Sequence, residues 1–530
     1  MPFLNTTIKK WGFALLLATP VFFFYFLHFF NHDKQHVSTG FIQWEHIVYM
    51  FSAKEYTTGS AAFLYEWPIL NSFNDGKVFF QPQIFALGYL WKWLPVSPGI
   101  LMMIFDFVFA VLTLKIVIEI IYYLLPAYRF KNLITVLFCW GGGLLSAAGI
   151  FLHFFFFKGS FGNIGDHIFF LDPANGSWSL NFGRTLIYPL ESYYHFLFVL
   201  CIWLALNKKF GATFFVMLLL TVSHPYTSIE IISITFAWIT TEVFYFKNIQ
   251  FSKKHFYYVL AALLLYFIYY AGILGSIKIY REINKLNSLD WGYKIWHFLP
   301  AYFIVWLCSF LSIRNIPLLK KHFSEPNNRL FFWWGTVAFL LSVHGFAINP
   351  EQPIHFTRGY VYAGFFLFSI PVLKLLINKC SLQGTKRHIL LFAFSFIFLF
   401  DNITWFGLAA ETINSPGVYF TLSEKELINF FEHQENKGIV TGNEKNYTLN
   451  AAIQLQSSKK VWISHPFLTF DITNKRATVT NFIHKNELDS NWKKTNVYLY
   501  FDRTDTTVNK PVDLQNPVFE NQQFSVFKIN

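Results

Sequence analysis

The chain has 530 residues, of which 54% are hydrophobic, 21% are aromatic and only 14% are charged. Ordinary soluble domains carry about 25% charged residues, so this composition excludes a soluble enzyme and indicates an integral membrane protein. The net charge of +12 lies largely in short loops between apolar runs. We therefore attribute the charge to membrane topology and expect no nucleic-acid partner.

The chain begins with a predicted first span. Residues 11–30 (WGFALLLATPVFFFYFLHFF) follow Lys9 and Lys10 and lack a small-residue cleavage site, so we expect an uncleaved anchor and a cytoplasmic N-terminus. Residues 31–98 then form a long first outer loop. Within it, residues 79–95 are too short to cross a bilayer comfortably, which predicts short helices at the membrane interface.

Apolar runs of about 20 residues, the length that crosses a bilayer as a helix, repeat along most of the chain. They predict about eleven transmembrane helices, those after the first falling at 99–125, 133–157, 190–207, 210–223, 225–246, 256–277, 295–313, 330–348, 359–378 and 388–408. The basic loops between them fall on the side of Lys9, as the positive-inside rule requires. That topology places the loops at 158–189, 278–294 and 349–358, and everything after about residue 410, on the outer side.

After residue 415 the sequence becomes polar and alternating. SEKELINFFEHQ (423–434) carries a capping box, Ser423 with Glu426, ahead of an amphipathic helix. GIVTG, KKVWIS, NVYLYFD and QFSVFKIN predict strands, and DITNKRATVTNFIH predicts a helix. The expected fold is an all-α polytopic membrane domain over residues 1–415, followed by a small extracytoplasmic α/β domain over residues 416–530.

Several segments resemble a known family. They are GFIQWEHIVYMFSAKEYTTG (40–59), VFFQPQIFALGYLWKWLPVSPG (78–99), SHPYT (223–227) and the pieces YFTLSEKELINFF, KKVWISHPFLT, NKRATVTNF and QQFSVFKI of the tail. With the topology above, they resemble the GT-C class of glycosyltransferases, in particular bacterial membrane proteins related to dolichyl-phosphate-mannose transferases. The resemblance implies transfer of a sugar from a polyprenyl-phosphate donor to a hydroxyl of a glycan, lipid or protein. It also implies a place in the bacterial cell envelope, at the outer face of the inner membrane.

The resemblance makes Glu45 the candidate catalytic base. Family members carry an aspartate in the first outer loop, often with a second acidic residue; here the loop offers Glu45, with these possible companions: Asp33, Glu55, Glu66 and Asp75. Burial among aromatic residues raises the pKa of a carboxyl group toward a useful range for removing the acceptor proton. The alternative is that Glu45 stabilises the start of the helix HIVYMFSAKEY through the helix dipole.

Arg358 is the candidate ligand of the lipid phosphate, as the resemblance implies an arginine near an outer helix end. HFTRGYVYAG (355–364) places His355 and Arg358 one helical turn apart at the outer end of a predicted span. A guanidinium binds phosphate oxygens through two parallel hydrogen bonds. The alternative is an arginine that reaches the lipid headgroups for topology alone. Arg184, in NFGRTLIYPLESYYH, is a second candidate, or else an ordinary loop arginine.

Other polar residues of the outer side are further candidates. Asp166, with His167 and Asp172, has the side chains that bind a divalent cation or sugar hydroxyls, although the spacing matches no metal motif. Glu191 and His195 lie one turn apart at the start of a span, either as a packing pair or as a substrate contact. His224, in His224-Pro225-Tyr226, sits in an outer turn, either as part of an interfacial turn or as a substrate ligand. A metal requirement stays open.

Acidic residues inside predicted spans support a rival interpretation, a proton-coupled transporter or flippase; they are Asp106, Glu119, Glu230, Glu242 and Asp401. The sequence has no internal repeat and a long outer loop, which weighs against transport. A non-catalytic scaffold of the same fold is a further alternative. No Gly-rich phosphate loop is present, so a soluble nucleotide-sugar donor is not expected, and the cysteines lack disulfide or zinc spacing: Cys139, Cys201, Cys308 and Cys380.

Overall fold

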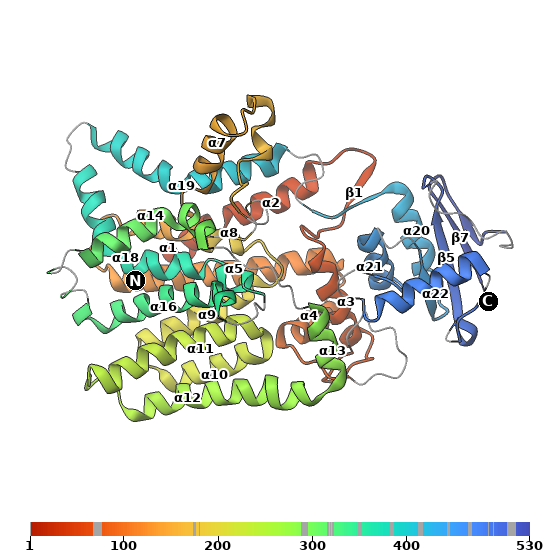
Figure 1. Cartoon of the computed structure of the whole chain (residues 1–530), viewed down its shortest axis with the longest axis horizontal. Coiled ribbons are helices and arrows are strands. Elements are labelled where there is room, and N and C mark those ends of the chain that lie inside the picture. Colours follow the sequence, from red (N-terminus) through yellow and green to blue (C-terminus); the bar gives the residue numbers. More distant parts are fainter. Residues whose placement is uncertain are drawn as a thin grey trace. The chain divides into compact units, whose positions relative to one another are not determined.

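The computed structural model of the chain is mostly helical, with one small sheet and a two-stranded ribbon (Figure 1). It describes residues 2–66, 77–172, 176, 178–179, 181–287, 295–314, 317, 320, 323–347, 352–381, 386–411, 417–442, 446–464, 469–485, 487–490, 492–505 and 516–529.

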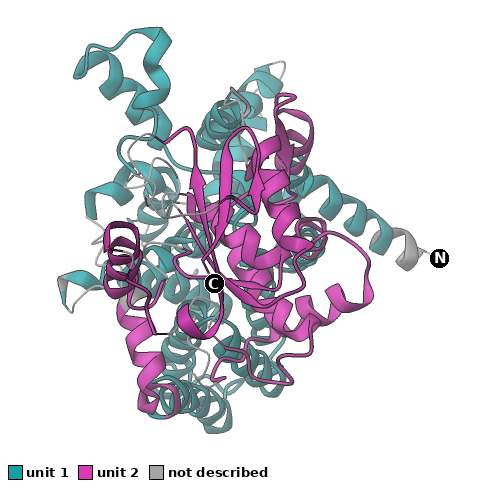
Figure 2. Cartoon of the chain, turned by 90° about the vertical axis from the view of Figure 1, so that its right-hand side faces the viewer, with its two compact units in different colours: residues 1–23, 106–272, 289–411 teal, residues 24–105, 273–288, 412–530 magenta. Residues whose placement is uncertain are grey.

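The chain forms two compact units, each built from separate stretches of sequence (Figure 2). Unit 1 contains residues 1–23, 106–272 and 289–411, and unit 2 contains residues 24–105, 273–288 and 412–530. The tail of the chain therefore shares one unit with the expected first outer loop. The expected boundary between residues 415 and 416 stays a prediction.

The helices agree with an integral membrane protein. Six described segments are long and apolar enough to cross a membrane. Three are single helices: α5 (Pro98–Leu124), α14 (Ile295–Arg314) and residues Arg387–Ala409 of α19 (Arg387–Glu411). The other three each join two elements: α11 (Pro225–Thr240) with η2 (Thr241–Tyr245), α12 (Lys253–Phe267) with η3 (Ile268–Leu274), and α17 (Ile354–Thr357) with α18 (Tyr360–Ser381). Two bent helix pairs raise the number to eight if each pair is one span. The remaining expected spans are the shorter helices α9 (Glu191–Leu206), α10 (Phe210–Ser223) and α16 (Pro326–Ser342). The expected total of about eleven stays a prediction.

Two expected spans are broken. The first bends by 44° between α1 (Pro2–Leu17) and α2 (Thr19–Phe30), and the run at 133–157 bends by 54° between α6 (Lys131–Trp140) and α7 (Leu145–Phe155). The sequence predicted one continuous helix over 133–157, and the structure corrects this. The glycine run 141–143 ends α6, and the Asp401 carboxylate then accepts the backbone N–H groups of Gly143, Leu145 and Ser146 at 3.0, 3.2 and 2.9 Å. Asp401 thus binds the N–H groups that the start of a helix leaves unsatisfied.

The helices that position the site belong to unit 1. Helices α9 and α10 form an antiparallel hairpin, and α10 leads directly into α11. Helix α16 packs closely on α18 because Gly335 and Gly364 face each other; a Cβ atom at Gly364 would lie 2.6 Å from the Cα atom of Gly335. Small residues of this kind let transmembrane helices approach closely. The short elements of unit 1 are η1 (Phe161–Asp166), α8 (Phe182–Thr185) and η4 (His344–Phe346).

In unit 2, the expected interfacial helices of the first loop are α3 (Glu45–Thr57) and α4 (Pro82–Trp93), with α13 (Lys278–Asn287) elsewhere in the chain. Helix α3 also packs on α21 (Tyr447–Gln456) of the tail, where the Lys54 ammonium donates to the Gln454 carbonyl at 2.9 Å. Strand β1 (His36–Ser38) pairs antiparallel with β2 (Tyr419–Thr421). The first loop and the tail are therefore folded together.

The tail forms a five-stranded sheet in the order β4-β3-β5-β7-β6. Strands β3 (Gly438–Thr441), β4 (Lys459–Val461) and β5 (Asn496–Asp502) run parallel, whereas β7 (Phe524–Lys528) runs antiparallel to β5 and to β6 (Phe519–Glu520). The tail also contains helices α20 (Leu422–Glu432) and α22 (Ile472–Lys485) and the turn η7 (Trp492–Lys494). Phe482, Trp492 and Leu499 belong to its buried core. The predicted strands and helices are found here.

The structure corrects the predicted capping box of α20. The structure begins the helix at Leu422, so Thr421 is the N-cap: its side chain accepts the Glu424 N–H, and the Glu424 carboxylate accepts the Thr421 N–H at 2.8 Å. Ser423, which the sequence predicted as the cap, lies inside the first turn. Both Thr421/Glu424 and Ser423/Glu426 have the spacing of a capping box, and the β1–β2 pairing selects the first because it holds residues up to Thr421 extended.

Candidate functional site

Five polar residues meet at one end of the helices of unit 1, and we call them the outer-mouth cluster: Glu191, His195, His224, His355 and Arg358. Glu191 begins α9, and His224 lies between the end of α10 and the start of α11. Because α9 and α10 are antiparallel, the start of one and the end of the other lie at the same end of the hairpin. His355 lies in α17, and Arg358 directly follows it. Four of the five are binding residues predicted from the sequence.

Glu191 and Arg358 form the centre of the cluster. The Glu191 side chain is 1% exposed, and its Oε1 atom accepts a hydrogen bond from Nη1 of Arg358, whose side chain is 19% exposed. The Arg358 guanidinium also lies over the ring of Tyr188, 5.7 Å from its centroid. Removing either member of a buried ion pair leaves the other charge uncompensated. Arg358 is thus held by Glu191 and Tyr188 while part of its side chain stays exposed.

His195 connects both residues through their backbones. Its Nδ1 atom lies 2.8 Å from the Glu191 carbonyl oxygen, and its Nε2 atom lies 2.9 Å from the Arg358 carbonyl oxygen. Carbonyl oxygens only accept, so each of these contacts is a hydrogen bond only when the ring nitrogen concerned carries a proton. Nε2 also lies 3.0 Å from Oγ1 of Thr185, and the carboxylate Oε2 of Glu191 lies 3.4 Å from Nδ1. The expected contact between Glu191 and His195 is present.

His224 and His355 complete the cluster. Their ring centroids lie 5.2 Å apart, with His224 stacked on Tyr194 at 4.3 Å and His355 stacked on Tyr226 at 4.5 Å. His224 caps α11, since its Nδ1 atom accepts the N–H of Thr227 at 3.2 Å. Burial lowers the pKa of His224 to about 4, so this imidazole is neutral at pH 7.

The side chains of Glu191, His224 and His355 offer ligand atoms that all lie within 4.8 Å of one another. This is close enough to share one metal ion. Sequence reasoning named each of these residues but placed a possible metal at Asp166, because no local spacing links positions 191, 224 and 355. The missing signal was topological: all three lie at helix ends that the predicted spans direct to the same side.

The stretch that includes Asp166 is arranged differently. Asp166 is exposed at the end of η1. The Asp172 carboxylate accepts the backbone N–H groups of Gly176, Trp178 and Ser179 at 2.8, 3.2 and 2.7 Å, and therefore orders its own loop. His167 contacts His153, with 3.0 Å between their Nδ1 atoms. Among the residues described, Asp166, His167 and Asp172 form no metal-ligand group.

Arg184 is a buried arginine in α8. Its side chain is 1% exposed, and its guanidinium lies over the ring of Trp405 at 5.0 Å. The Nε and Nη1 atoms have no hydrogen-bond partner in the described part of the chain. Burial lowers the pKa of Arg184, and the nearby Tyr188 and Asp172 oppose that shift. Arg184 is therefore not a solvated arginine, and its role in binding stays a prediction.

Glu45 belongs to unit 2, where it is the first residue of α3 and is half-buried. That position is the one in which a carboxylate stabilises a helix start, and it leaves the catalytic role a prediction. Of its possible companions, Glu55 accepts the N–H of Glu66 at 3.2 Å, and burial raises the pKa of Glu55. Asp75 lies outside the described residues.

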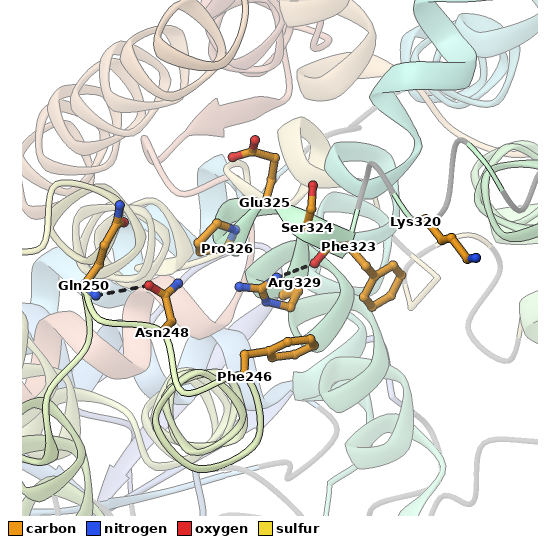
Figure 3. Close-up of a pocket in the computed structure, with 9 residues that line it drawn as sticks. All are labelled: Phe246, Asn248, Gln250, Lys320, Phe323, Ser324, Glu325, Pro326 and Arg329. Carbon is orange, nitrogen blue, oxygen red and sulfur yellow. Dashed lines mark hydrogen bonds between the residues drawn. The ribbon is translucent and has the colours of Figure 1, made fainter.

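A pocket of about 700 Å³ lies near the other end of α11 (Figure 3). Phe246, Asn248 and Arg329 are among its lining residues. The Arg329 guanidinium is occupied by Glu242 and by the Phe323 carbonyl oxygen. Because the Arg329 side chain is only 5% exposed and is already bound in this way, we do not take this pocket as the functional site.

No family profile matches the sequence. No curated protein matches it either. Among solved structures, the chain is similar to an oligosaccharyltransferase from Archaeoglobus fulgidus in the apo form, with a TM-score of 0.47 and 10% identity over 94% of this chain and 69% of that one. It is also similar to ArnT from Cupriavidus metallidurans bound to undecaprenyl phosphate, with a TM-score of 0.49 and 9% identity over 98% of both chains.

With identities of 9–10% and TM-scores below 0.5, these two similarities establish neither the family nor the activity of this chain. At such identities and TM-scores they assign no role to any residue of this chain. The roles of the outer-mouth cluster therefore rest on its own contacts.

Proposed function

We propose that the protein is a membrane glycosyltransferase that moves a sugar from a polyprenyl-phosphate donor to an acceptor hydroxyl. The observation that carries the proposal is the setting of Arg358: a partly exposed arginine whose guanidinium is bound by Glu191 and whose backbone carbonyl lies 2.9 Å from His195, where α9, α11 and α18 begin. Helix N-termini and a guanidinium together favour a phosphate group. Undecaprenyl phosphate, the lipid bound to ArnT, is the natural probe.

Arg358 would bind the phosphate that leaves. As the acceptor oxygen bonds to the anomeric carbon, the bond from that carbon to the phosphate oxygen breaks and its electron pair remains on the phosphate. Fixed cations stabilise charge that develops in a transition state. Glu191 and His195 would act as positioning residues, because they contact Arg358 directly.

Glu45 would act as the general base and accept the proton of the acceptor hydroxyl. Arg184, His224 and His355 would contact the donor, and Asp166 would accept hydrogen bonds from sugar hydroxyls. We further propose the outer face of a bacterial inner membrane as the location, with a cytoplasmic N-terminus. The acceptor, a glycan, lipid or protein, would be oriented by the extracytoplasmic tail, residues 416–530.

The test uses the purified full chain in lipid nanodiscs with undecaprenyl-phosphate-linked sugars, and measures release of undecaprenyl phosphate. We expect Arg358→Lys to lower turnover by about 100-fold, because a point charge replaces a fork of donors. Arg387→Lys, at an exposed position at the start of α19, is the matched control. Equal turnover by Arg358→Lys and wild type would remove this site from the reaction, and no turnover by wild type with any polyprenyl donor would overturn the function.

A proton-coupled transporter is the second candidate, and Glu230 favours it. This α11 residue is 0% exposed, and neither carboxylate oxygen has a hydrogen-bond partner among the described residues. A carboxylate in a membrane span often carries protons. If a pH gradient drives solute uptake into proteoliposomes by wild type but not by Glu230→Gln, transport replaces sugar transfer.

A further inference from the structure

The outer-mouth cluster presents unused ligand atoms. Oε2 of Glu191 and Nδ1 of His355 are buried and take part in no hydrogen bond among the described residues, although His195 Nδ1 lies 3.4 Å from the former. Burying polar atoms without partners costs free energy. Two such atoms in one group of potential ligands therefore indicate a missing occupant.

The tautomers of both histidines are compatible with a metal. Nε2 of His355 lies 2.9 Å from the amide oxygen Oε1 of Gln352, an acceptor, so the proton sits on Nε2 and the lone pair on Nδ1. Nδ1 of His224 lies 2.8 Å from Oγ1 of Thr227. A proton on this Nδ1 donates to Thr227 and leaves the lone pair on Nε2. In this tautomer Nδ1 no longer accepts the Thr227 N–H, so the 3.2 Å N-cap bond of α11 is lost when the metal binds.

We propose that Glu191, His224 and His355 bind one divalent transition metal ion of the zinc type, through Oε2, Nε2 and Nδ1. Two imidazoles and one carboxylate form a ligand set that proteins use for catalytic zinc, with a further position left open. Mg²⁺ prefers oxygen ligands and is not expected here. The inference goes beyond the proposed function, because metal binding does not depend on sugar transfer.

The surroundings of the three ligands support this assignment. Each ligand has its other polar atom held by the protein: Oε1 of Glu191 by Arg358, Nδ1 of His224 by Thr227, and Nε2 of His355 by Gln352. Partners of this kind orient metal ligands and fix their tautomers.

The charges predict an anion at the open position. Arg358 already offsets the single negative charge of Glu191, so a divalent metal leaves the cluster strongly positive. A phosphate oxygen on the metal, beside Arg358, restores the balance. We therefore expect inorganic phosphate to tighten metal binding.

The experiment measures metal binding by the tag-free full chain after treatment with a chelator. Cobalt is titrated as a spectroscopic probe and bound zinc is measured by atomic absorption, with and without inorganic phosphate. We expect about one tightly bound zinc per chain, visible-range absorption by cobalt, and no competition by magnesium. Zinc affinity should fall at least about 100-fold in Glu191→Gln and His355→Gln.

Two further variants sharpen the test. Thr227→Val removes only the acceptor that holds the proton on Nδ1 of His224, and should weaken zinc about 10-fold. His433→Gln, at an exposed position after α20, is the control and should bind as wild type. If Glu191→Gln does not fold, His355→Gln and Thr227→Val decide. Wild type without the tight zinc, or equal binding by all variants, overturns the proposal; zinc binding without sugar transfer overturns only the proposed function.

Discussion

The guanidinium of Arg358 is hydrogen-bonded to the buried carboxylate of Glu191, 167 residues away in sequence. This one contact joins the start of α9 to the turn before α18. The ring of His195 lies beside this contact, within hydrogen-bond distance of the backbone carbonyl oxygens of both residues. The chemistry of the cluster and the packing of unit 1 therefore depend on the same atoms.

Glu191→Gln should lower the stability of the protein measurably. The amide keeps the shape of the carboxylate but leaves Arg358 without its counter-charge. A fully buried pair broken in this way costs about 3–5 kcal/mol; because Arg358 is partly exposed, we expect about 1–3 kcal/mol. Thermal unfolding in nanodiscs is the measurement.

Glu119→Gln is the control for that experiment. Glu119 in α5 pairs with Lys10 and Lys115, but its side chain is 26% exposed. A pair of that kind contributes about 1 kcal/mol or less. If Glu119→Gln destabilises the protein as much as Glu191→Gln does, the carboxylate of Glu191 has no special structural role.

Gly143→Ala should destabilise unit 1 because α14 passes directly over this residue. A Cβ atom there would overlap the carbonyl oxygens of Pro300 and Ala301. The clash displaces the N–H group that Gly143 donates to Asp401, so we expect a loss of about 2 kcal/mol or more. The measurement is the midpoint of thermal unfolding.

The matched substitution is Gly211→Ala. Gly211 lies in α10, and among the described residues no atom outside its own helical turn lies within 4 Å of the position that an alanine Cβ atom would take. Alanine should therefore be neutral there or stabilise the helix by about 0.5 kcal/mol. Equal destabilisation by both changes would show that backbone freedom, not the contact with α14, is what Gly143 provides.

Local patterns in the sequence predicted the elements well. Strand β5 coincides with the predicted run NVYLYFD. The prediction succeeds because consecutive β-branched and aromatic residues are typical of a buried strand. The predicted capping box was wrong by two residues because two overlapping pairs satisfy the same rule, and only the pairing of β1 with β2 decides between them. The continuous helix at 133–157 was wrong because its break depends on Asp401, which is remote in sequence.

The candidate site was predicted residue by residue but not as a group. Arg358, His355, His195 and His224 were each chosen because they fall at outer helix ends. Their convergence follows from which helices pack together, and no spacing within a single helix contains that information. Glu191 was expected to contact His195, one turn away, but its contact with Arg358 is tertiary and was not predicted.

The stability of the protein should rise between about pH 8 and pH 10 through Lys54. Burial lowers the pKa of Lys54 to about 8, whereas an unfolded lysine titrates near about 10.4. Between these values the unfolded chain binds more protons, so raising the pH favours the folded state. Below about pH 8 Lys54 is protonated in both the folded and the unfolded state, so it does not make the stability depend on pH. Thermal unfolding between pH 7 and pH 10 measures the effect.

Lys54→Met should remove that rise, and Lys437→Met, at an exposed position before β3, should retain it. A profile unchanged by Lys54→Met would show that other groups set the alkaline stability, and that the contact between α3 and α21 does not depend on the charge of Lys54.

The role of Glu45 can be tested with two variants: Glu45→Gln removes the charge, and Glu45→Asp keeps the charge on a shorter side chain. If it only stabilises the start of α3, Glu45→Gln costs about 0.3–1 kcal/mol, and Glu45→Asp costs less because the charge stays near the helix N-terminus. If it is the base, both variants lose sugar transfer: glutamine cannot accept the proton, and aspartate holds its carboxylate one methylene short of the acceptor. Release of undecaprenyl phosphate and thermal unfolding are measured on the same samples. Full turnover by Glu45→Asp with a small loss of stability in Glu45→Gln would assign Glu45 to the helix and leave the base to be found elsewhere in the chain.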